Sequence, residues 1–274
     1  MFVGASRCNI LISGFLFLGF PDEIISCSVE VSNTPPDEAR LAIVIQLCQT
    51  KQYDQALEGL IFCSSGMETV EGFNASNDLF MEAMRGKRLE YAKLNRHAKN
   101  PLYGNLRAPA ISRRDAFAKC FWDYGERWRL TLADRIRTTK DKGLLIKWHL
   151  ALGDLYRFYL DLPFPEQPFN VGDLLQASQN QYEKALILVR TSPIPVGEDV
   201  DMFKVYSNYA LLNHRYSPDS KAAVLILNNA LGIIADAEAR NESLEPEVAG
   251  LKDFMLRNRA EWLNVADAEW ELVS

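Results

Sequence analysis

Asp154 and Arg157 are the residues whose types and spacing most clearly suggest chemistry, because they stand one helical turn apart in a largely apolar stretch, Leu144–Leu162. An arginine guanidinium stays protonated in proteins, so burying it without partners is costly. One interpretation is an i,i+3 ion pair in which the two side chains satisfy each other. The other is an arginine held rigid to receive an anion from outside the chain. The two residues alone leave both interpretations open.

The stretch that carries this pair is long enough for a helix of about five turns. Its larger apolar side chains recur at helical spacing and include Leu145, Trp148, Leu152, Leu155, Tyr156, Tyr159 and Leu162. Much of the opposite face is apolar too, and a helix of this kind is buried on several sides within a bundle. We therefore expect this helix at the centre of the fold, where it would position Arg157 rigidly.

The rest of the chain from Pro36 onward also has helical periodicity, without a convincing alternating strand. The expected helices cover about 36–50, 52–66, 76–99, 112–140, 144–162, 171–190, 198–216, a segment starting at Ser217-Pro218-Asp219, and 244–265. Asn100-Pro101, Gly104 and Pro109 predict a loop between the third and fourth helices. The predicted fold class is all-α, with one helical domain over 36–265 and a C-terminal tail at 266–274.

Residues 1–35 form an N-terminal extension with a short apolar run. A basic residue, Arg7, precedes the apolar run Ile10–Phe20, and small residues follow it, which is a pattern typical of signal peptides. The run is too short to span a bilayer, which takes roughly 20 residues. Three interpretations stay open: an extension packed on the helical domain, a signal peptide, or a contact with a membrane or partner.

Signatures of catalysis are missing from the sequence. It has no glycine-rich phosphate loop with Gly-Lys-Ser/Thr, no His-Glu-x-x-His and no Gly-x-Ser-x-Gly. The three histidines lie on different expected helices, and the five cysteines are scattered without metal-ligand spacing. We therefore expect no enzyme activity, no cofactor and no metal site.

The net charge of −6 and the isoelectric point near 5.3 argue mildly against wholesale binding to nucleic acid, which usually needs a basic surface. An odd number of scattered cysteines favours reduced thiols, and reduced thiols are typical of the cytosol. We therefore expect a cytoplasmic protein that does not bind nucleic acid.

Several local sequences together resemble the 14-3-3 family. LCQTKQYDQALEGL at 47–60 resembles the junction of that family's first two helices, and IKWHLALGDLYRFYLDL at 146–162 resembles its fifth helix. The order and spacing of further matches point the same way: Asn208-Tyr209, Ser217-Pro218-Asp219, and LKDFMLRNRAEWL at 251–263. The resemblance covers about 37–265, but the family signature of the third helix is barely recognisable. The chain is similar to a divergent member.

This resemblance implies a single domain of about nine antiparallel helices that form a cupped bundle with an amphipathic groove. It also implies a non-catalytic signalling adaptor whose groove binds phosphoserine or phosphothreonine peptides of partner proteins. Members assemble as dimers through their N-terminal helices, so a homodimer or a heterodimer with another member is expected. Residues 37–66 would then pack on the partner around Leu79–Leu89 and Phe121–Trp128.

The site residues follow from the resemblance, position by position. The phosphate would be held by Arg157 of the fifth helix and by Arg85, which falls where the family has a lysine. The peptide backbone would bind the amides of Asn208 and Asn258. The apolar wall of the groove would consist of Leu211, Leu251 and Phe254. In this setting Asp154 would orient Arg157 rather than neutralise it.

Two departures predict a modified or weakened phosphate pocket. Phe158 replaces the family's tyrosine after Arg157, so a hydroxyl donor is lost, and Ala92 stands where a second arginine is expected. Arg88 and Arg96 lie on nearly the same face of the third helix as Arg85 and could compensate. A solvated basic face is the alternative interpretation of these three arginines.

A second function class stays open. A helical scaffold of the tetratricopeptide type would bind unphosphorylated peptides on a similar concave face. No sustained repeat of about 34 residues is visible, which argues against it. Binding that depends on the phosphate would distinguish the two classes.

Overall fold

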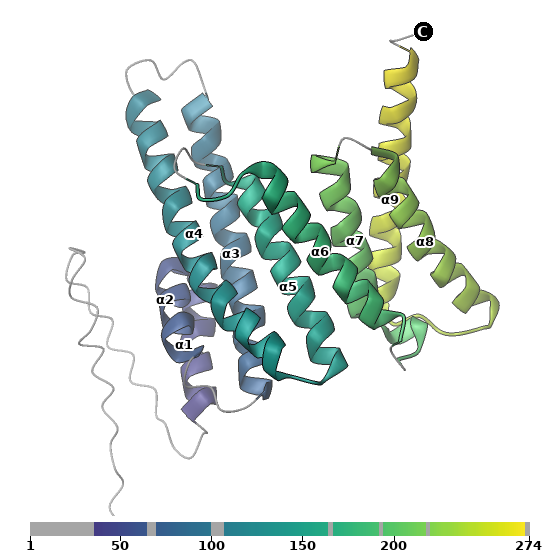
Figure 1. Ribbon diagram of the computed structural model, residues 1–274, viewed down its shortest axis with the longest axis horizontal. Coiled ribbons are helices and arrows are strands. Elements are labelled where there is room, and N and C mark those ends of the chain that lie inside the picture. Colours follow the sequence, from purple (N-terminus) through teal and green to yellow (C-terminus); the bar gives the residue numbers. More distant parts are fainter. Residues whose placement is uncertain are drawn as a thin grey trace, which may run out of the picture. The chain divides into compact units, whose positions relative to one another are not determined.

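The computed structural model describes residues 36–64, 70–99, 107–163, 167–191, 194–217 and 220–271 of the chain. Nine α-helices and one short 3₁₀ helix, η2, make up this part, and these ranges contain no strand (Figure 1). The elements are α1 (Pro36–Gln49), α2 (Tyr53–Ser64), α3 (Val70–Lys99), α4 (Arg107–Thr138), α5 (Lys142–Asp161), α6 (Val171–Val189), η2 (Val196–Glu198), α7 (Val200–Tyr216), α8 (Ser220–Ala239) and α9 (Pro246–Glu271). The predicted all-α class is confirmed.

Three helix boundaries differ from the sequence-based expectation. Helix α3 begins at Val70 rather than at Ser76. Helix α4 begins at Arg107, so Pro109 lies in its first turn and not in a loop. Proline is tolerated there because the first N–H groups of a helix lack intrahelical partners. Helix α9 continues to Glu271, beyond the expected end near 265.

Two further expectations lie outside the described residues. The apolar run Ile10–Phe20 belongs to the undescribed part of the chain, and so do Pro218 and Asp219 at the expected start of the eighth helix.

Helix α5 is buried on several sides, as its sequence predicted. It contacts α3, α4, α6 and α7. Its buried residues are Ile146, Trp148, His149, Ala151, Leu152, Gly153, Asp154, Leu155, Arg157, Phe158, Tyr159 and Leu160. Asp141 caps its start, since the Asp141 side chain accepts a hydrogen bond from the Leu144 N–H at 3.1 Å. The helix that carries Arg157 is therefore fixed by its neighbours along most of its length.

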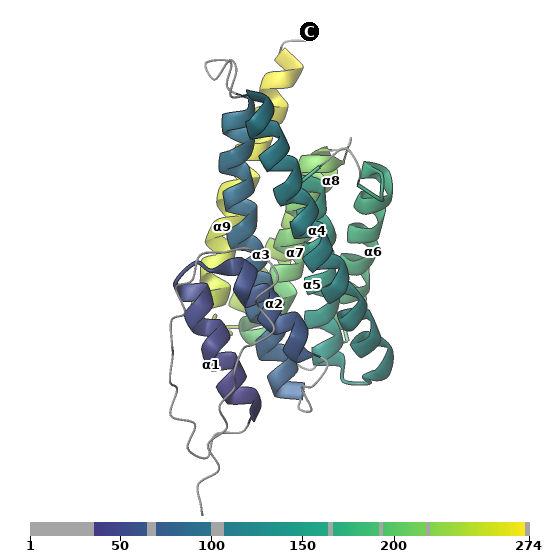
Figure 2. The same cartoon turned by 90° about the vertical axis from the view of Figure 1, so that its left-hand side faces the viewer.

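The N-terminal helices bury their apolar faces within the chain itself. Helices α1 and α2 contact α3, and α2 also contacts α4 (Figure 2). Leu57 and Leu60 of α2 are fully buried, and Phe121 and Trp128 of α4 are fully buried as well. Phe121 and Trp128 themselves therefore offer no surface to a partner, and a dimer contact over 121–128 would have to use exposed residues between them, such as Asp123 and Arg127.

Three helix glycines, Gly86, Gly125 and Gly153, allow tyrosines of neighbouring helices to approach the backbone closely. A Cβ at Gly153 of α5 would lie 2.7 Å from the ring of Tyr182, which comes from α6. A Cβ at Gly125 of α4 would overlap the hydroxyl of Tyr159, which comes from α5. Glycine inside a helix lowers the stability of the helix by about 1 kcal/mol relative to alanine. At these positions that loss accompanies a close packing that an alanine side chain would prevent. The contact at Gly153 also matters for the site described below.

Helix α8 contains a stretch, Lys221–Ala239, that is long and apolar enough to cross a membrane by length and composition. In this fold Ala223, Leu227, Ala230 and Ile234 are fully buried against the other helices. Their spacing follows one face of the helix, as expected for a helix that packs on a core.

Candidate anion-binding site

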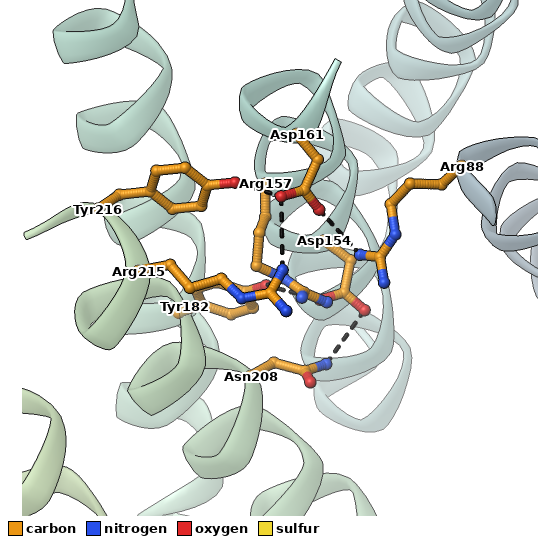
Figure 3. Close-up of polar contacts among 8 residues, drawn as sticks. All are labelled: Arg88, Asp154, Arg157, Asp161, Tyr182, Asn208, Arg215 and Tyr216. Carbon is orange, nitrogen blue, oxygen red and sulfur yellow. Dashed lines mark hydrogen bonds and ion pairs between the residues drawn. The ribbon is translucent and has the colours of Figure 1, made fainter. Parts of the chain in front are cut away.

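Arg157 and Asp154 form a buried ion pair, as the first interpretation of the sequence required. Arg157 Nη2 lies 3.0 Å from Asp154 Oδ1, and the two side chains are 6% and 4% exposed. Tyr182 of α6 bridges them, since its hydroxyl accepts from Arg157 Nε at 3.2 Å and donates to Asp154 Oδ1 at 2.6 Å. The other oxygen of Asp154 accepts from Asn208 Nδ2 at 3.1 Å (Figure 3). Arg157 is thus held in one orientation by side chains from α5 and α6.

The protonation states of this network follow from its surroundings. Burial alone would lower the pKa of Arg157, but Tyr182 and Asp154 raise it above its ordinary value, so the guanidinium stays charged. Burial, followed by the negative charge of Asp154, raises the pKa of Tyr182 well above its ordinary value. Tyr182 therefore keeps its proton and remains a donor to Asp154.

Asp161, one turn after Arg157 on α5, organises a second and more exposed group of side chains. Its Oδ2 lies 3.0 Å from Arg88 Nη1 of α3, and its Oδ1 lies 3.5 Å from Arg215 Nη1 of α7. Tyr216, the last residue of α7, donates its hydroxyl to the same Oδ1. The Asp161 side chain is 16% exposed, whereas Arg88 and Arg215 are 26% and 44% exposed.

Phe158 lies between the two groups. The guanidinium of Arg88 lies 4.9 Å from the Phe158 ring centroid, and that of Arg157 lies 5.3 Å from it. The pKa of Arg88 is lowered by burial, and the nearby charges of Arg157 and Arg215 add to the lowering. Arg88 and Arg215 share Asp161 as a partner, and Arg88 and Arg157 share the Phe158 ring, so three guanidinium groups from three helices converge here (Figure 3). With the carboxylates of Asp154 and Asp161, they leave one net positive charge.

Of the four predicted phosphate ligands, the structure brings Arg88 and Arg157 together and places Arg85 and Arg96 elsewhere on α3. Arg85 is exposed, and its charge is among those that oppose the rise in the pKa of Asp78, a rise caused by burial. Arg96 is exposed, and its Nε donates to the backbone oxygen of Ala92 in its own helix at 3.4 Å. Arg96 starts about 12 Å along the helix axis from Arg88, at 1.5 Å per residue.

The predicted residues of α7 share one face with Arg215. Asn208, Leu211 and Arg215 follow one another at intervals of three and four residues. Asn208 is half-buried through its bond to Asp154, and Leu211 is a half-buried side chain packed against the core. The face of α7 that carries the cluster is therefore polar at both ends and apolar between them.

The predicted residues of α9 share a face in the same way. Leu251, Phe254 and Asn258 continue the spacing that begins at Glu247, which pairs with Lys204 of α7 at 2.7 Å. Lys204 precedes Asn208 on α7 by one turn. The ion pair between Lys204 and Glu247 therefore links the α7 face that carries Asn208 to the α9 face that carries Asn258. Leu251 packs against the core and Phe254 is 37% exposed. The two asparagines and the apolar side chains thus belong to neighbouring helices.

Sequence reasoning missed four residues of this cluster: Asp161, Tyr182, Arg215 and Tyr216. Helical spacing could have found two of them. Asp161 is four residues after Arg157, and Arg215 is seven residues after Asn208, so each shares a face with a predicted residue. Tyr182 looks like an ordinary core aromatic in sequence, and only the packing of α6 on α5 reveals its hydroxyl as a partner of Arg157.

The described residues contain no group of three or more His, Cys, Asp and Glu side chains placed to hold a metal ion. No protein-family model matches the chain, and the search of curated proteins finds no match either. The class of protein that the described residues define is therefore a bundle of nine α-helices with a buried arginine network.

Proposed function

We propose that this protein is a divergent 14-3-3-like adaptor that binds phosphoserine or phosphothreonine segments of partner proteins without catalysing a reaction. The observation that carries the proposal is the convergence of Arg88, Arg157 and Arg215 from three different helices: Arg88 and Arg215 pair with Asp161, and Arg88 and Arg157 lie against the Phe158 ring. Charge-assisted bonds between guanidinium groups and phosphate oxygens are among the strongest hydrogen bonds in proteins. A rigid arrangement of such donors reduces the entropy that a ligand loses on binding.

The arginines of the cluster would have different roles in binding the phosphate. Arg157 is fixed by Asp154 and Tyr182, so it presents its charge in a constant position. Arg88 and Arg215 are partly exposed and can turn toward an incoming phosphate.

The peptide chain itself would be held beside the phosphate. Asn208 donates its amide N–H to Asp154, which leaves its oxygen to accept from a peptide N–H. Asn258 would bind the backbone farther along, and Leu211, Leu251 and Phe254 would contact the peptide side chains.

Assembly and location belong to the same proposal. We expect a cupped arrangement of the helices with an amphipathic groove, a dimer formed through the N-terminal helices, and residence in the cytoplasm. Ile45 of α1 and Leu89 of α3 are 41% and 61% exposed, so both helices still have apolar surface for a partner.

A second function, binding of unphosphorylated peptides to a helical scaffold, is favoured by one observation. Asp154 and Asp161 already supply the arginine cluster with carboxylate partners. If those pairs were permanent, the face formed by α7 and α9 would bind peptides through its asparagines and apolar side chains alone.

A peptide array separates the two functions. The array holds one pool of peptides with a fixed central phosphoserine and a second pool with an unphosphorylated serine at the same position. We expect the wild-type protein to bind the phosphoserine pool at least about tenfold more tightly than the serine pool, because the serine peptides lack at least one charge-assisted bond. Equal binding to the two pools would favour the phosphate-independent scaffold. Binding to neither pool would overturn both functions.

A further inference from the structure

The carboxylate of Asp161 has the surroundings expected of a bound anion. It accepts from Arg88 of α3 and from Arg215 and Tyr216 of α7, so its donors come from two helices other than its own. A carboxylate at the last residue of a helix is disfavoured by the helix dipole, and Asp161 is the last residue of α5. The side chain is therefore held in place by cations and a hydroxyl rather than by its own helix.

The charge of the cluster matches a phosphate only when Asp161 is absent from it. With both carboxylates present, the three guanidinium groups leave one net positive charge. Without Asp161 they leave two, and a phosphoserine carries about −1.5 to −2 at pH 7. The Asp161 side chain is 16% exposed at a helix end, so it can rotate toward solvent without crossing the core.

We propose that the partner's phosphate binds where the Asp161 carboxylate now lies, and that Asp161 acts as a built-in competitor which the phosphate displaces. This inference rests on the proposed function. In the bound state Arg88, Arg215 and Tyr216 donate to phosphate oxygens instead of to Asp161. Tyr216 then supplies the hydroxyl donor that Phe158 lacks. Arg157 stays paired with Asp154, and its positive charge attracts the phosphate without a direct bond to it.

A built-in competitor lowers the apparent affinity in proportion to the fraction of molecules whose site is free. Because Asp161 is tethered, it competes at a high effective concentration, and dilution does not remove it. The site would therefore bind only ligands that exceed a carboxylate in charge and in number of acceptor oxygens. Phosphorylated segments meet this condition better than segments with aspartate or glutamate do.

The test is calorimetry with a phosphoserine peptide pool on the wild type, Asp161→Asn and Asp134→Asn. Asp134 is 60% exposed on α4 and pairs with Arg137, so its variant makes the same change in net charge outside the site. We expect Asp161→Asn to bind at least about tenfold more tightly than the wild type, because the phosphate no longer has to break a charge-assisted bond of Asp161, worth about 1.5–3 kcal/mol, before it binds. Asp134→Asn should bind as the wild type does.

The outcomes separate this inference from the proposed function. If the wild type binds the phosphoserine pool and folded Asp161→Asn binds no more tightly, the competitor role is overturned and the proposed function stands. If neither protein binds the pool, the proposed function fails and this inference fails with it. If only Asp161→Asn binds, phosphate does not displace Asp161 from the wild-type site, so the displacement and the proposed function of the wild type are both overturned.

A second measurement avoids any variant that fails to fold. In wild-type protein, the ¹³C signal of the Asp161 carboxyl should shift when the phosphoserine pool saturates the site, because the carboxyl leaves its three donors. An unchanged signal at saturation would overturn the displacement.

Discussion

Arg157 differs from the other guanidinium groups of the cluster in how completely its neighbours surround it. Its side chain is 6% exposed, whereas those of Arg88 and Arg215 are 26% and 44% exposed. The two interpretations of Arg157 that the sequence left open are therefore not exclusive. The ion pair with Asp154 is present, and together with Tyr182 it fixes the guanidinium in one orientation, as the proposed anion site requires.

This burial changes what a substitution of Arg157 should do. Arg157→Ala leaves the carboxylate of Asp154 buried with only Tyr182 and Asn208 as donors. Breaking a buried ion pair in this way costs about 3–5 kcal/mol of unfolding free energy. Urea denaturation should show this loss. Arg137→Ala, at a side chain that is 78% exposed, should cost less than about 1 kcal/mol. Equal effects of the two substitutions would mean that the Arg157 network does not stabilise the fold.

Helix α5 shows how far sequence reasoning reaches at the scale of an element. The apolar residues around its circumference predicted a central helix, and the structure confirms this with contacts to four other helices. The start of α3 at Val70 was missed because tertiary packing overrides weak local propensity. The helical position of Pro109 was missed because proline disrupts a helix only beyond its first turn.

The candidate site also contains residues that the sequence could predict and residues that it could not. Arg157, Arg88 and Asn208 could be predicted, and the structure brings them into one cluster around Asp154 and Phe158. Tyr182 could not, because its role depends on the close packing of α6 at Gly153, which leaves no periodic pattern in the sequence.

Gly153 provides the test at this scale. Gly153→Ala places a Cβ 2.7 Å from the Tyr182 ring, so the ring must move and its bonds to the ion pair must lengthen. Overpacking of this kind costs about 1–3 kcal/mol. Gly232→Ala of α8 meets no atom within 4 Å among the described residues, and there the better helix propensity of alanine should stabilise the fold by about 0.5–1 kcal/mol. Thermal melts should move in opposite directions for the two variants, and a stabilised Gly153→Ala would contradict the close packing.

At the scale of the whole molecule, the open question is which surface forms the expected dimer. Helices α1 and α2 satisfy their main apolar contacts on α3 and α4 of the same chain. The exposed apolar side chains that remain on α1 and α3 are the surface available for a dimer. A stable dimer needs to bury more than about 1,000 Å² in total.

Leu89 tests the expected dimer. Leu89→Asp places a charge on a side chain that is 61% exposed in α3, within the expected partner contact. Light scattering at micromolar concentration should show a dimer for the wild type and a monomer for this variant. Leu225→Asp is the matched control, since Leu225 is equally exposed but lies on α8. A monomeric wild type, or dissociation by both variants alike, would count against assembly through the N-terminal helices.

The central claim is that the arginine cluster recognises phosphate, and fluorescence anisotropy with Arg215→Ala tests it most directly. Arg215 is 44% exposed, so its removal should leave the thermal melt close to that of the wild type. Losing one charge-assisted bond of about 1.5–3 kcal/mol should weaken binding of the phosphoserine pool by about tenfold to a hundredfold. Arg137→Ala should leave that binding unchanged. Phosphoserine binding that is equally tight in the wild type and Arg215→Ala, or no phosphoserine binding by the wild type, would contradict the claim.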